Sequence, residues 1–413
     1  MLQDYSCAEK IVRHSMTFVY LSTGILDSVF ESQVLPVLRK MNRKDCRVVH
    51  ISSEPFLSTR SEEWKRRADL VGKEPFETVY VRKLPELNRV TLKFDAYRVY
   101  RVLSRHIQGP VVVHARGHMN AWKACIYNRC WAVFADLRGA IWDEKARTEP
   151  AAFQSLRCRP TTDFFLEIEE DVVRKADKTT CVSRAFREHL QSRNPFSDIA
   201  VIPTFVDDAG FRFDPGARRE TRHRLSVGNR PVFVFSAGSA RWQMTSDLIK
   251  WCAGISNLLP ESFFLILSLI PHKVQALAAK WLRSGCFIVK KVSYTEVGRY
   301  LSASDIGLLF RERLWTNRVA APTKFSEYAC SGLPVCITRG IGDTEEYVKT
   351  VGSGVIIDSV KEGPDISGLR RLLNVDREDS SRRGVKEYSR TRWIDVLERE
   401  YSLLAARKPA LRT

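Results

Sequence analysis

Short apolar runs that alternate with amphipathic stretches are the feature of this sequence that most limits its fold. In the first half of the chain they predict strands at residues 16–22, 46–53, 78–82, 110–115, 178–182 and 199–202, and helices at 27–41, 61–71, 92–107 and 161–175. In the second half they predict strands at 231–237, 262–267, 286–290, 306–310 and 335–337. Strands that alternate with helices at this spacing pair in parallel and carry helices on both faces. We therefore expect an α/β fold with doubly wound parallel sheets.

The length of the chain and the segment after residue 202 indicate how these elements divide. At 413 residues the chain is long for one core and has room for two α/β domains. Residues 203–207 follow the strand at 199–202, and we interpret them as the segment that passes between domains. Trp393, Leu397 and Tyr401 lie at helical spacing and predict a final helix. The expected parts are a first domain at 1–205, a second domain at 206–385, and a C-terminal segment at 386–413.

The charge balance limits the possible partners. The chain has 66 Lys and Arg against 48 Asp and Glu, a net charge of +18. Nucleic acid, an anionic membrane surface and phosphorylated small molecules would each suit such a protein. No compact nucleic-acid recognition motif is present, and the basic residues are spread through folded-looking segments such as 39–44, 65–67 and 218–224. We therefore expect no nucleic-acid partner, and the other two possibilities stay open.

Several other signals are missing from the sequence. No run of eighteen or more apolar residues occurs, and the first residues lack the apolar core of a signal peptide. We expect no membrane-spanning segment and a cytoplasmic location. The sequence has no H-E-x-x-H, no D-x-D and no paired Cys/His spacing. We therefore expect neither a bound metal nor a cofactor.

Residues 321–335 carry the pattern that says most about chemistry. Pro322 and Thr323 predict the start of a helix, and the threonine hydroxyl is expected to cap free backbone N–H groups. Lys324 and Glu327 fall in its first two turns. A helix start with a lysine suits a phosphate or diphosphate, and a glutamate there can accept hydrogen bonds from a vicinal diol such as a ribose. A solvated lysine–glutamate pair on a surface helix would give the same pattern.

The loops after two buried runs of the first half, at 113–118 and 133–139, carry four polar groups. These are His114, Arg116, Asp136 and Arg138. In open α/β sheets ligands bind beyond the carboxyl ends of the strands, where these residues would lie. The alternatives are a buried, satisfied histidine and a local ion pair between Asp136 and Arg138. Gly24, at the end of the first strand, allows the backbone to approach a ligand, although a plain turn would also explain it.

The ordered series of motifs resembles the GT-B glycosyltransferases, in particular the retaining family 4-like group. The motifs lie at residues 203–211, 235–243, 292–310, 321–335 and 338–346. The resemblance implies two Rossmann-like domains that face each other across a cleft, with the C-terminal helix crossing back to the first. It also implies transfer of a sugar from a nucleotide-diphospho-sugar, with retention and without a metal. Acceptors in this group are commonly lipid-linked carriers of surface polysaccharide assembly.

The resemblance also implies roles for residues of the second domain. Glu327 would hold the ribose hydroxyls, and the backbone of Lys291, Val292 and Ser293 would meet the base. The loop that begins at Gly238 and Ser239 would approach the donor. Arg241 and Lys324 would balance the diphosphate, although many relatives carry a lysine-glycine pair where this chain has Trp242 and Gln243. Many relatives carry a second glutamate at the position of Val319, and Asn317 and Glu312 are nearby polar residues.

Two other interpretations remain open. One is a sugar-nucleotide epimerase or phosphorylase of the same architecture. The other is a protein without catalysis that binds polyanions or an anionic membrane. For the main interpretation we expect His114, Arg116, Asp136 and Arg138 to line the acceptor side. We also expect the basic segments 39–44 and 65–67 to bring the enzyme to the inner face of the membrane.

Overall fold

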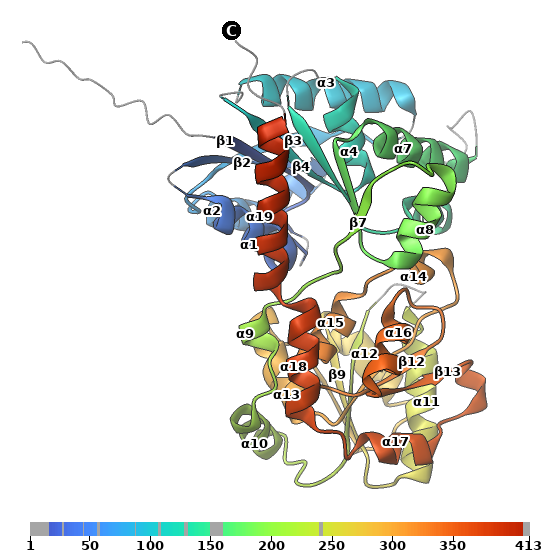
Figure 1. Cartoon of the computed structure of the whole chain (residues 1–413). Coiled ribbons are helices and arrows are strands. Elements are labelled where there is room, and N and C mark those ends of the chain that lie inside the picture. Colours follow the sequence, from blue (N-terminus) through green and yellow to red (C-terminus); the bar gives the residue numbers. More distant parts are fainter. Residues whose placement is uncertain are drawn as a thin grey trace, which may run out of the picture.

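The computed structural model describes residues 16–26, 29–43, 45–55, 58–86, 88–105, 109–127, 131–148, 160–238 and 243–407. These residues form two α/β domains, one above the other in Figure 1. One contains a seven-stranded sheet and the other a six-stranded sheet, and every pair of neighbouring strands is parallel. The expected doubly wound α/β architecture is confirmed.

The first sheet has its strands in the order β3-β2-β1-β4-β5-β6-β7. Their bounds are β1 Met16–Thr23, β2 Cys46–Pro55, β3 Glu77–Lys83, β4 Val111–Arg116, β5 Ala132–Leu137, β6 Lys178–Cys181 and β7 Ile199–Val201. The chain reverses direction across the sheet between β1 and β4. In such sheets the carboxyl ends of the strands at this switch point form the usual ligand site. Gly24 and Arg116 therefore lie at the edge where a ligand is expected.

Helices cover both faces of this sheet. They are the π-helix η1 Phe30–Val34, α1 Leu35–Met41, the 3₁₀ turn η2 Ser58–Arg60, α2 Glu62–Val71, α3 Arg89–Arg105, α4 His118–Ile126, α5 Ile141–Thr148, α7 Thr161–Lys175 and α8 Arg184–Arg193. Successive residues of a strand face opposite sides, so Val19 packs into one core and Phe18 into the other. The predicted helix at 27–41 changes from π to α just before Pro36.

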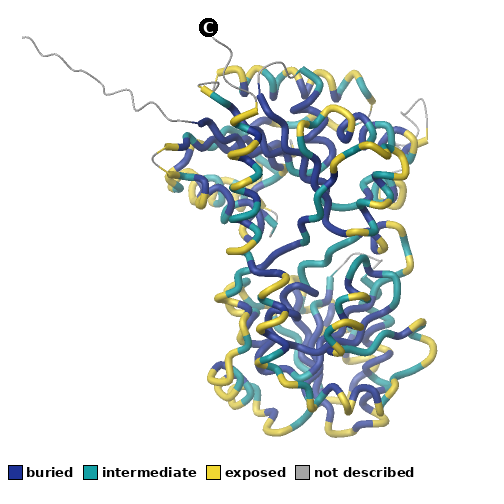
Figure 2. Tube along the Cα trace, viewed as in Figure 1, coloured by how far each residue is buried: buried dark blue, intermediate teal, exposed yellow. Residues whose placement is uncertain are grey.

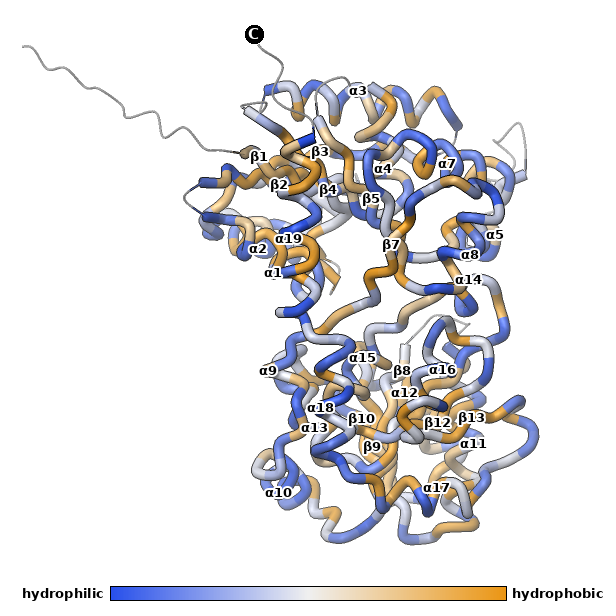
Figure 3. Tube along the Cα trace, viewed as in Figure 1, coloured by the Kyte–Doolittle hydropathy of each residue, from blue (hydrophilic) through white to orange (hydrophobic). Residues whose placement is uncertain are grey.

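The second sheet has the order β10-β9-β8-β11-β12-β13. Its strands are β8 Val232–Ala237, β9 Phe263–Ser268, β10 Phe287–Lys290, β11 Ile306–Leu309, β12 Val335–Thr338 and β13 Gly354–Ile357. The helices of this domain are α9 Asp208–Phe211, α10 Pro215–Arg224, α11 Thr245–Leu258, α12 Pro271–Ala278, α13 Tyr294–Ala303, α14 Trp315–Arg318, α15 Thr323–Cys330, α16 Thr344–Val351, the 3₁₀ turn η4 Val360–Glu362, α17 Ile366–Leu372 and α18 Arg377–Tyr388. Figures 2 and 3 show that burial and hydrophobicity coincide in the strands of both domains.

The last helix, α19 Arg390–Arg407, leaves the second domain and lies against the first (Figure 1). Leu397 and Tyr401 pack in the same core as Phe18 of β1. Where α19 begins, the backbone of Arg390 donates to the carbonyl of Val206 at 2.8 Å, so the chain passes between the domains twice at adjacent points. The expectation that the C-terminal helix returns to the first domain is confirmed.

Candidate active site

Helix α15 begins where the second domain meets the first. Phe325, Tyr328 and Ala329 are buried in the core of the second domain, which orients the helix. Its N-cap residue is Pro322, and no side chain caps the helix. The prediction that the hydroxyl of Thr323 caps it was wrong, because Thr323 is already the first helical residue. The free N–H groups of the first turn are therefore not satisfied by a capping side chain.

Lys324 and Glu327 are held inside the molecule, unlike a solvated surface pair. The Nζ of Lys324 donates to the carbonyl of Ser236 at 2.8 Å and to the Oε1 of Gln243 at 3.3 Å. Burial lowers the pKa of Lys324 to about 8, with a contribution from Arg311 and an opposing one from Glu327. Glu327 is 8% exposed, and among the described residues nothing hydrogen-bonds to or forms an ion pair with its carboxylate. Burial raises the pKa of Glu327 to about 8 against the opposing charge of Lys324.

Arg311 is a second cation at this edge and was not predicted. It follows β11, and its backbone N–H and carbonyl both bond to the hydroxyl of Thr338, at 2.8 and 2.9 Å. Its Nε is buried and has no hydrogen-bond partner within the described part of the chain. Burial lowers the pKa of Arg311 to about 10, and its charge also acts on Lys324. The rule that located Arg116 and Arg138, a polar residue just after a buried strand, would have found it.

The loop after β8 is only partly described. The side chain of Gln243 lies over Gly238 so closely that a Cβ at this position would collide with it. A larger residue at position 238 would therefore have to displace the end of the Gln243 side chain. Ser239 and Arg241 lie outside the described residues, so their expected roles stay predictions.

Lys291, Val292 and Ser293 form the turn from β10 into α13. Ser293 is the N-cap of α13, and its hydroxyl donates to Glu296 at 2.7 Å in a capping box. Lys291 is exposed, and Val292 packs against the core of the second domain. The side chain of Ser293 is therefore engaged locally, and the expected backbone contact with a base remains a prediction.

Val319 occupies the position at which many relatives carry a second glutamate. Val319 is fully buried in the core of the first domain, and its carbonyl accepts a hydrogen bond from the hydroxyl of Ser183 at 2.8 Å. Asn317 is also buried, and its amide nitrogen donates to the carbonyl of Glu312 at 2.8 Å. This segment therefore joins the two domains.

In the first domain, Asp136 binds two arginines. The Nη1 of Arg116 donates to its Oδ2 at 3.1 Å, and the Nη1 of Arg138 donates to its Oδ1 at 3.2 Å. Burial alone would raise the pKa of Asp136, but Arg138, His114 and Arg116 together hold it well below its usual range. Asp136 is therefore ionised, and the local ion pair considered above is present.

His114 lies in the core and not at the rim. It is 1% exposed and stacked on Tyr20, with ring centroids 4.2 Å apart. Its Nδ1 lies 2.6 Å from the hydroxyl of Tyr401 on α19. Burial lowers the pKa of His114. This is the buried histidine of the alternative interpretation, but it is only partly satisfied, because its Nε2 has no hydrogen-bond partner in the described part of the chain and lies 3.5 Å from the Oδ2 of Asp136.

A pocket of about 500 Å³ opens at the carboxyl ends of β1, β3, β4 and β5; we call it the first-domain pocket. Of the residues predicted for the acceptor side, it is lined by Arg116 and Arg138, but by neither His114 nor Asp136; Gly24, predicted to let the backbone approach a ligand, lines it as well. The polar residues that line it and were not predicted are Ser22, Thr23, Lys83, Glu86, His118, Asn120, Glu144 and Lys145. His114 lies within β4, whereas His118, four residues later, is the first residue of α4 and lines the pocket.

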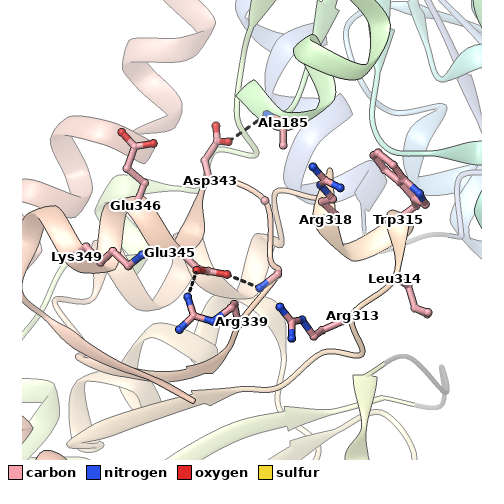
Figure 4. A pocket seen from close by; sticks show the side chains of 12 residues that line it. Ala185, Arg313, Leu314, Trp315, Arg318, Arg339, Asp343, Glu345, Glu346 and Lys349 are labelled. Atoms are coloured by element: carbon pink, nitrogen blue, oxygen red, sulfur yellow. Dashed lines mark hydrogen bonds and ion pairs between the residues drawn. The ribbon is translucent and has the colours of Figure 1, made fainter. Parts of the chain in front are cut away.

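A second pocket, of about 660 Å³, lies between α14 and α16 and reaches Ala185 of the first domain (Figure 4). Its acidic residues form hydrogen bonds or ion pairs with other residues of the protein. Asp343 accepts hydrogen bonds from the backbone of Arg184, at 2.8 and 3.0 Å, and Glu345 binds Arg339. Arg313, also in this wall, is exposed. We call this the α14–α16 pocket.

None of the described helices is both long enough and apolar enough to cross a bilayer. In the same part of the chain, no three or more His, Cys, Asp and Glu residues are grouped so that they could hold a metal ion.

Comparisons with known proteins agree with this architecture. Residues 31–209 match the family model described as Glycosyltransferase Family 4. No curated protein matches the sequence. Three similar solved structures are a glycosyltransferase from Rickettsia africae, sucrose-phosphate synthase from Thermosynechococcus elongatus and Anabaena HepE in complex with UDP.

The similarity to these structures extends over the whole fold. The Rickettsia protein is 13% identical, with coverage of 94% of this chain and 98% of that one and a TM-score of 0.66. The synthase is 12% identical, with coverage of 95% and 100% and a TM-score of 0.67. HepE is 13% identical, with coverage of 94% and 100% and a TM-score of 0.64. The chain thus has the GT-B fold, and its resemblance to family 4-like glycosyltransferases is confirmed.

Proposed function

We propose that the protein transfers a sugar from a nucleotide-diphospho-sugar to a carbohydrate or lipid-linked acceptor, with retention and without a metal. The observation that carries the proposal is the start of α15. An uncapped helix start and Lys324 gather at one edge of the second sheet with the Nε of Arg311 and the carboxyl group of Glu327, neither of which has a hydrogen-bond partner among the described residues. A nucleoside diphosphate offers the matching groups, namely an anion for the cations and a ribose diol for the carboxylate.

In this proposal the chemistry depends on charge that grows on the leaving diphosphate. Lys324 and Arg311 stabilise that charge as the glycosidic bond loosens, because preorganised cations in a partly buried site act more strongly than in water. Glu327 fixes the nucleoside by accepting hydrogen bonds from the ribose. The acceptor enters from the first domain, whose pocket opens at the carboxyl ends of its strands.

The ligands of one structural neighbour indicate which compounds to test first. HepE has been crystallised with UDP, with UDP and glucose, and with UDP-glucose. We therefore begin with UDP and UDP-glucose and compare other nucleoside diphosphates and their sugars. Calorimetry should detect binding of at least one diphosphate, and the nucleotide-sugar with the same base should be hydrolysed slowly without an acceptor. No binding of any nucleoside diphosphate would refute the proposal.

Metal independence, retention and the rival activities each need a separate measurement. Activity that persists in a chelator supports metal independence, whereas loss in the chelator and recovery with a divalent ion contradicts it. The anomeric configuration of the first product, followed by NMR, decides retention. An epimerase would change the nucleotide-sugar without an acceptor, and a phosphorylase would require inorganic phosphate. A binding protein without catalysis would respond equally to any polyanion and lose this response in salt.

We also propose that the enzyme works at an anionic membrane surface, through a different part of the first domain from the one the sequence suggested. In the segment 39–44, the residues Arg39, Lys40 and Arg43 form ion pairs with acidic residues of the same protein, at 2.5 to 2.9 Å. Lys65 and Arg67 are paired as well. Their charges are thus largely compensated within the molecule.

Helix α3 has the surface that suits lipid. Val90, Phe94 and Tyr97 are 75%, 56% and 47% exposed along one side of it. Lys93 and Arg101 are exposed beside them, and among the described residues they form no ion pair. Asp95, the one acidic residue of the helix, is buried. Apolar side chains flanked by cations are typical of helices that bind anionic bilayers, and α3 lies on the side of the first domain away from the second (Figure 1).

Co-sedimentation with vesicles tests this location. Binding is expected with anionic vesicles at low salt and not with neutral ones. The double variant Phe94→Ser, Tyr97→Ser should lose it, while Leu70→Ser, an equally exposed residue on α2, should keep it. Equal binding of both variants would contradict the role of α3.

A further inference from the structure

Two pairs of cations from different elements reach the first-domain pocket, and each pair shares a single carboxylate. Arg116 and Arg138 share Asp136, as described above. Lys83 and Lys145 share Glu86, with Nζ to carboxylate oxygen distances of 3.4 and 3.2 Å. Among the described residues, two positive charges stand against one negative charge in each of these ion-pair groups, which gives each group a net charge of about +1.

Both shared carboxylates are ionised, so this count holds at neutral pH. Burial opposes ionisation of Glu86, but Lys83, Lys145 and Lys123 outweigh it and lower its pKa to about 2. Lys123 is buried and does not line the pocket, and its Nζ lies 3.5 Å from the Oδ2 of Asp95. The pKa of Asp136 is also held low. Glu144 also lines the pocket, so with its carboxylate counted as ionised the four cations and three carboxylates leave the wall of the pocket with a net charge of about +1.

The start of α4 adds to this field. His118, Met119 and Asn120 form its first turn and line the pocket, and the N-cap is Gly117, which has no side chain to bond the free N–H groups. Helix starts carry partial positive charge, which adds to that of the two cation pairs.

The same pocket also has oxygen acceptors that the described residues do not use. Asn120 is 2% exposed, and its amide nitrogen donates to the carbonyl of Arg116 and to the hydroxyl of Thr23, both at 2.9 Å. The bond to a carbonyl fixes the amide orientation. Its Oδ1 is then buried and has no partner in the described part of the chain.

Glu144 is the second such acceptor. Its carboxylate lines the pocket and takes part in no hydrogen bond or ion pair with the other described residues. Burial raises its pKa, opposed by His118 and Lys145. Oxygen atoms of this kind suit hydroxyl donors, because a buried acceptor without a donor costs free energy.

We infer that the first-domain pocket binds a carbohydrate that carries a negatively charged group, a phosphate or a carboxylate, next to its hydroxyls. The cation pairs bind the anion, and Asn120 and Glu144 accept from the hydroxyls. This names the class of the acceptor and rests on the proposed function only in treating the pocket as the acceptor side. A pocket of about 500 Å³ has the size of an ordinary small-molecule site.

Direct binding tests the inference without any transfer reaction. Glucose, glucose 6-phosphate, glucuronate and farnesyl phosphate are titrated by calorimetry into the protein, with Lys324→Ala as the background so that anions do not occupy the donor site. Glucose 6-phosphate or glucuronate should bind at least tenfold more tightly than glucose. Tight binding of farnesyl phosphate as well would show that the phosphate of a lipid carrier also satisfies the cations.

Two variants locate the binding. Lys145→Gln and Lys83→Gln each remove one charge and leave Glu86 with one lysine, and each should weaken binding of the preferred anion at least fivefold. Arg313→Ala removes an exposed cation of the α14–α16 pocket and should change nothing. Equal binding of glucose and the anions, unchanged binding in both lysine variants, or loss in Arg313→Ala would overturn the inference.

These results are separate from those for the donor. If UDP fails to bind but the anionic sugars bind as expected, the proposed function fails and the assignment of the pocket stands. If UDP binds but the anionic sugars bind no more tightly than glucose, the assignment of the pocket fails and the proposed function stands. Thermal unfolding of each variant confirms that it is folded before it is titrated.

Discussion

Glu327→Gln tests the donor site most sharply, because it should change stability and binding in opposite directions. The folded protein holds the pKa of Glu327 at about 8, against an ordinary value of 4.5. A raised carboxyl pKa contributes stability that is fully present below 4.5 and is lost as the pH rises through 8. Each pH unit in that window costs the wild type about 1.4 kcal/mol, so the upper limit of the loss is about 5 kcal/mol.

Glutamine does not ionise, so the variant escapes this loss. Its stability relative to the wild type should therefore increase between pH 5 and pH 8, by several kcal/mol as an order of magnitude. Unfolding midpoints of both proteins, measured side by side at the two pH values, give this difference directly. A difference that stays constant between pH 5 and pH 8 would refute the view that a buried, unpaired carboxyl occupies this position.

At pH 8, where Glu327 is partly ionised, binding of UDP should weaken in the same variant. A hydrogen bond to a carboxylate is stronger than one to a neutral amide by about 1–2 kcal/mol, which corresponds to a roughly fivefold to thirtyfold loss of affinity. Calorimetry on protein shown to be folded measures it. An unchanged affinity would remove Glu327 from the donor site, even if the stability prediction were confirmed.

Three further predictions concern neighbouring groups. Because Lys324 and Glu327 both have pKa values near 8, the affinity for UDP, measured relative to the double variant Lys324→Arg, Glu327→Gln, should be highest near pH 8. Glu327→Gln should remove the fall in affinity at lower pH, and Lys324→Arg should remove the fall at higher pH. An unaltered pH profile in both single variants would contradict the pairing. Arg311→Ala should lower turnover more than donor affinity, because leaving-group charge grows in the transition state; steady-state kinetics in which only KM changes would contradict this. Tyr401→Phe removes the hydroxyl next to the Nδ1 of buried His114 and should lower the free energy of unfolding by about 1–3 kcal/mol without changing UDP binding, as denaturation and calorimetry would show.

The strands and their parallel arrangement could be predicted because they depend on local patterns. A run such as 231–237 is apolar on both faces, and this pattern is specific to a strand covered by helices on both sides. The capping box of Ser293 and the N-cap of Ser183 likewise depend on residues close in sequence. The Thr323 cap failed because proline can occupy the N-cap position, which moves the threonine into the helix.

The site was harder to predict where it depends on distant packing. His114 was expected at the rim because it ends an apolar strand. Only the position of Tyr401, nearly three hundred residues later, shows that its ring faces the core under α19. Likewise, no pattern near Val319 indicates that it packs in the core of the other domain. Lys83 and Lys145 are far apart in sequence and come together only through their common partner Glu86.

The two candidate sites are physically joined through Thr204, in the segment that passes between the domains. Its hydroxyl accepts a hydrogen bond from Arg138 at 3.1 Å and donates to the carbonyl of Ala321 at 2.7 Å. Its own carbonyl accepts from the hydroxyl of Ser326, inside α15, at 2.6 Å. One residue therefore connects an arginine of the first-domain pocket with the helix that carries Lys324 and Glu327. A rotation of one domain against the other would have to break these hydrogen bonds. While they are intact, α15 and Arg138 therefore keep their relative position.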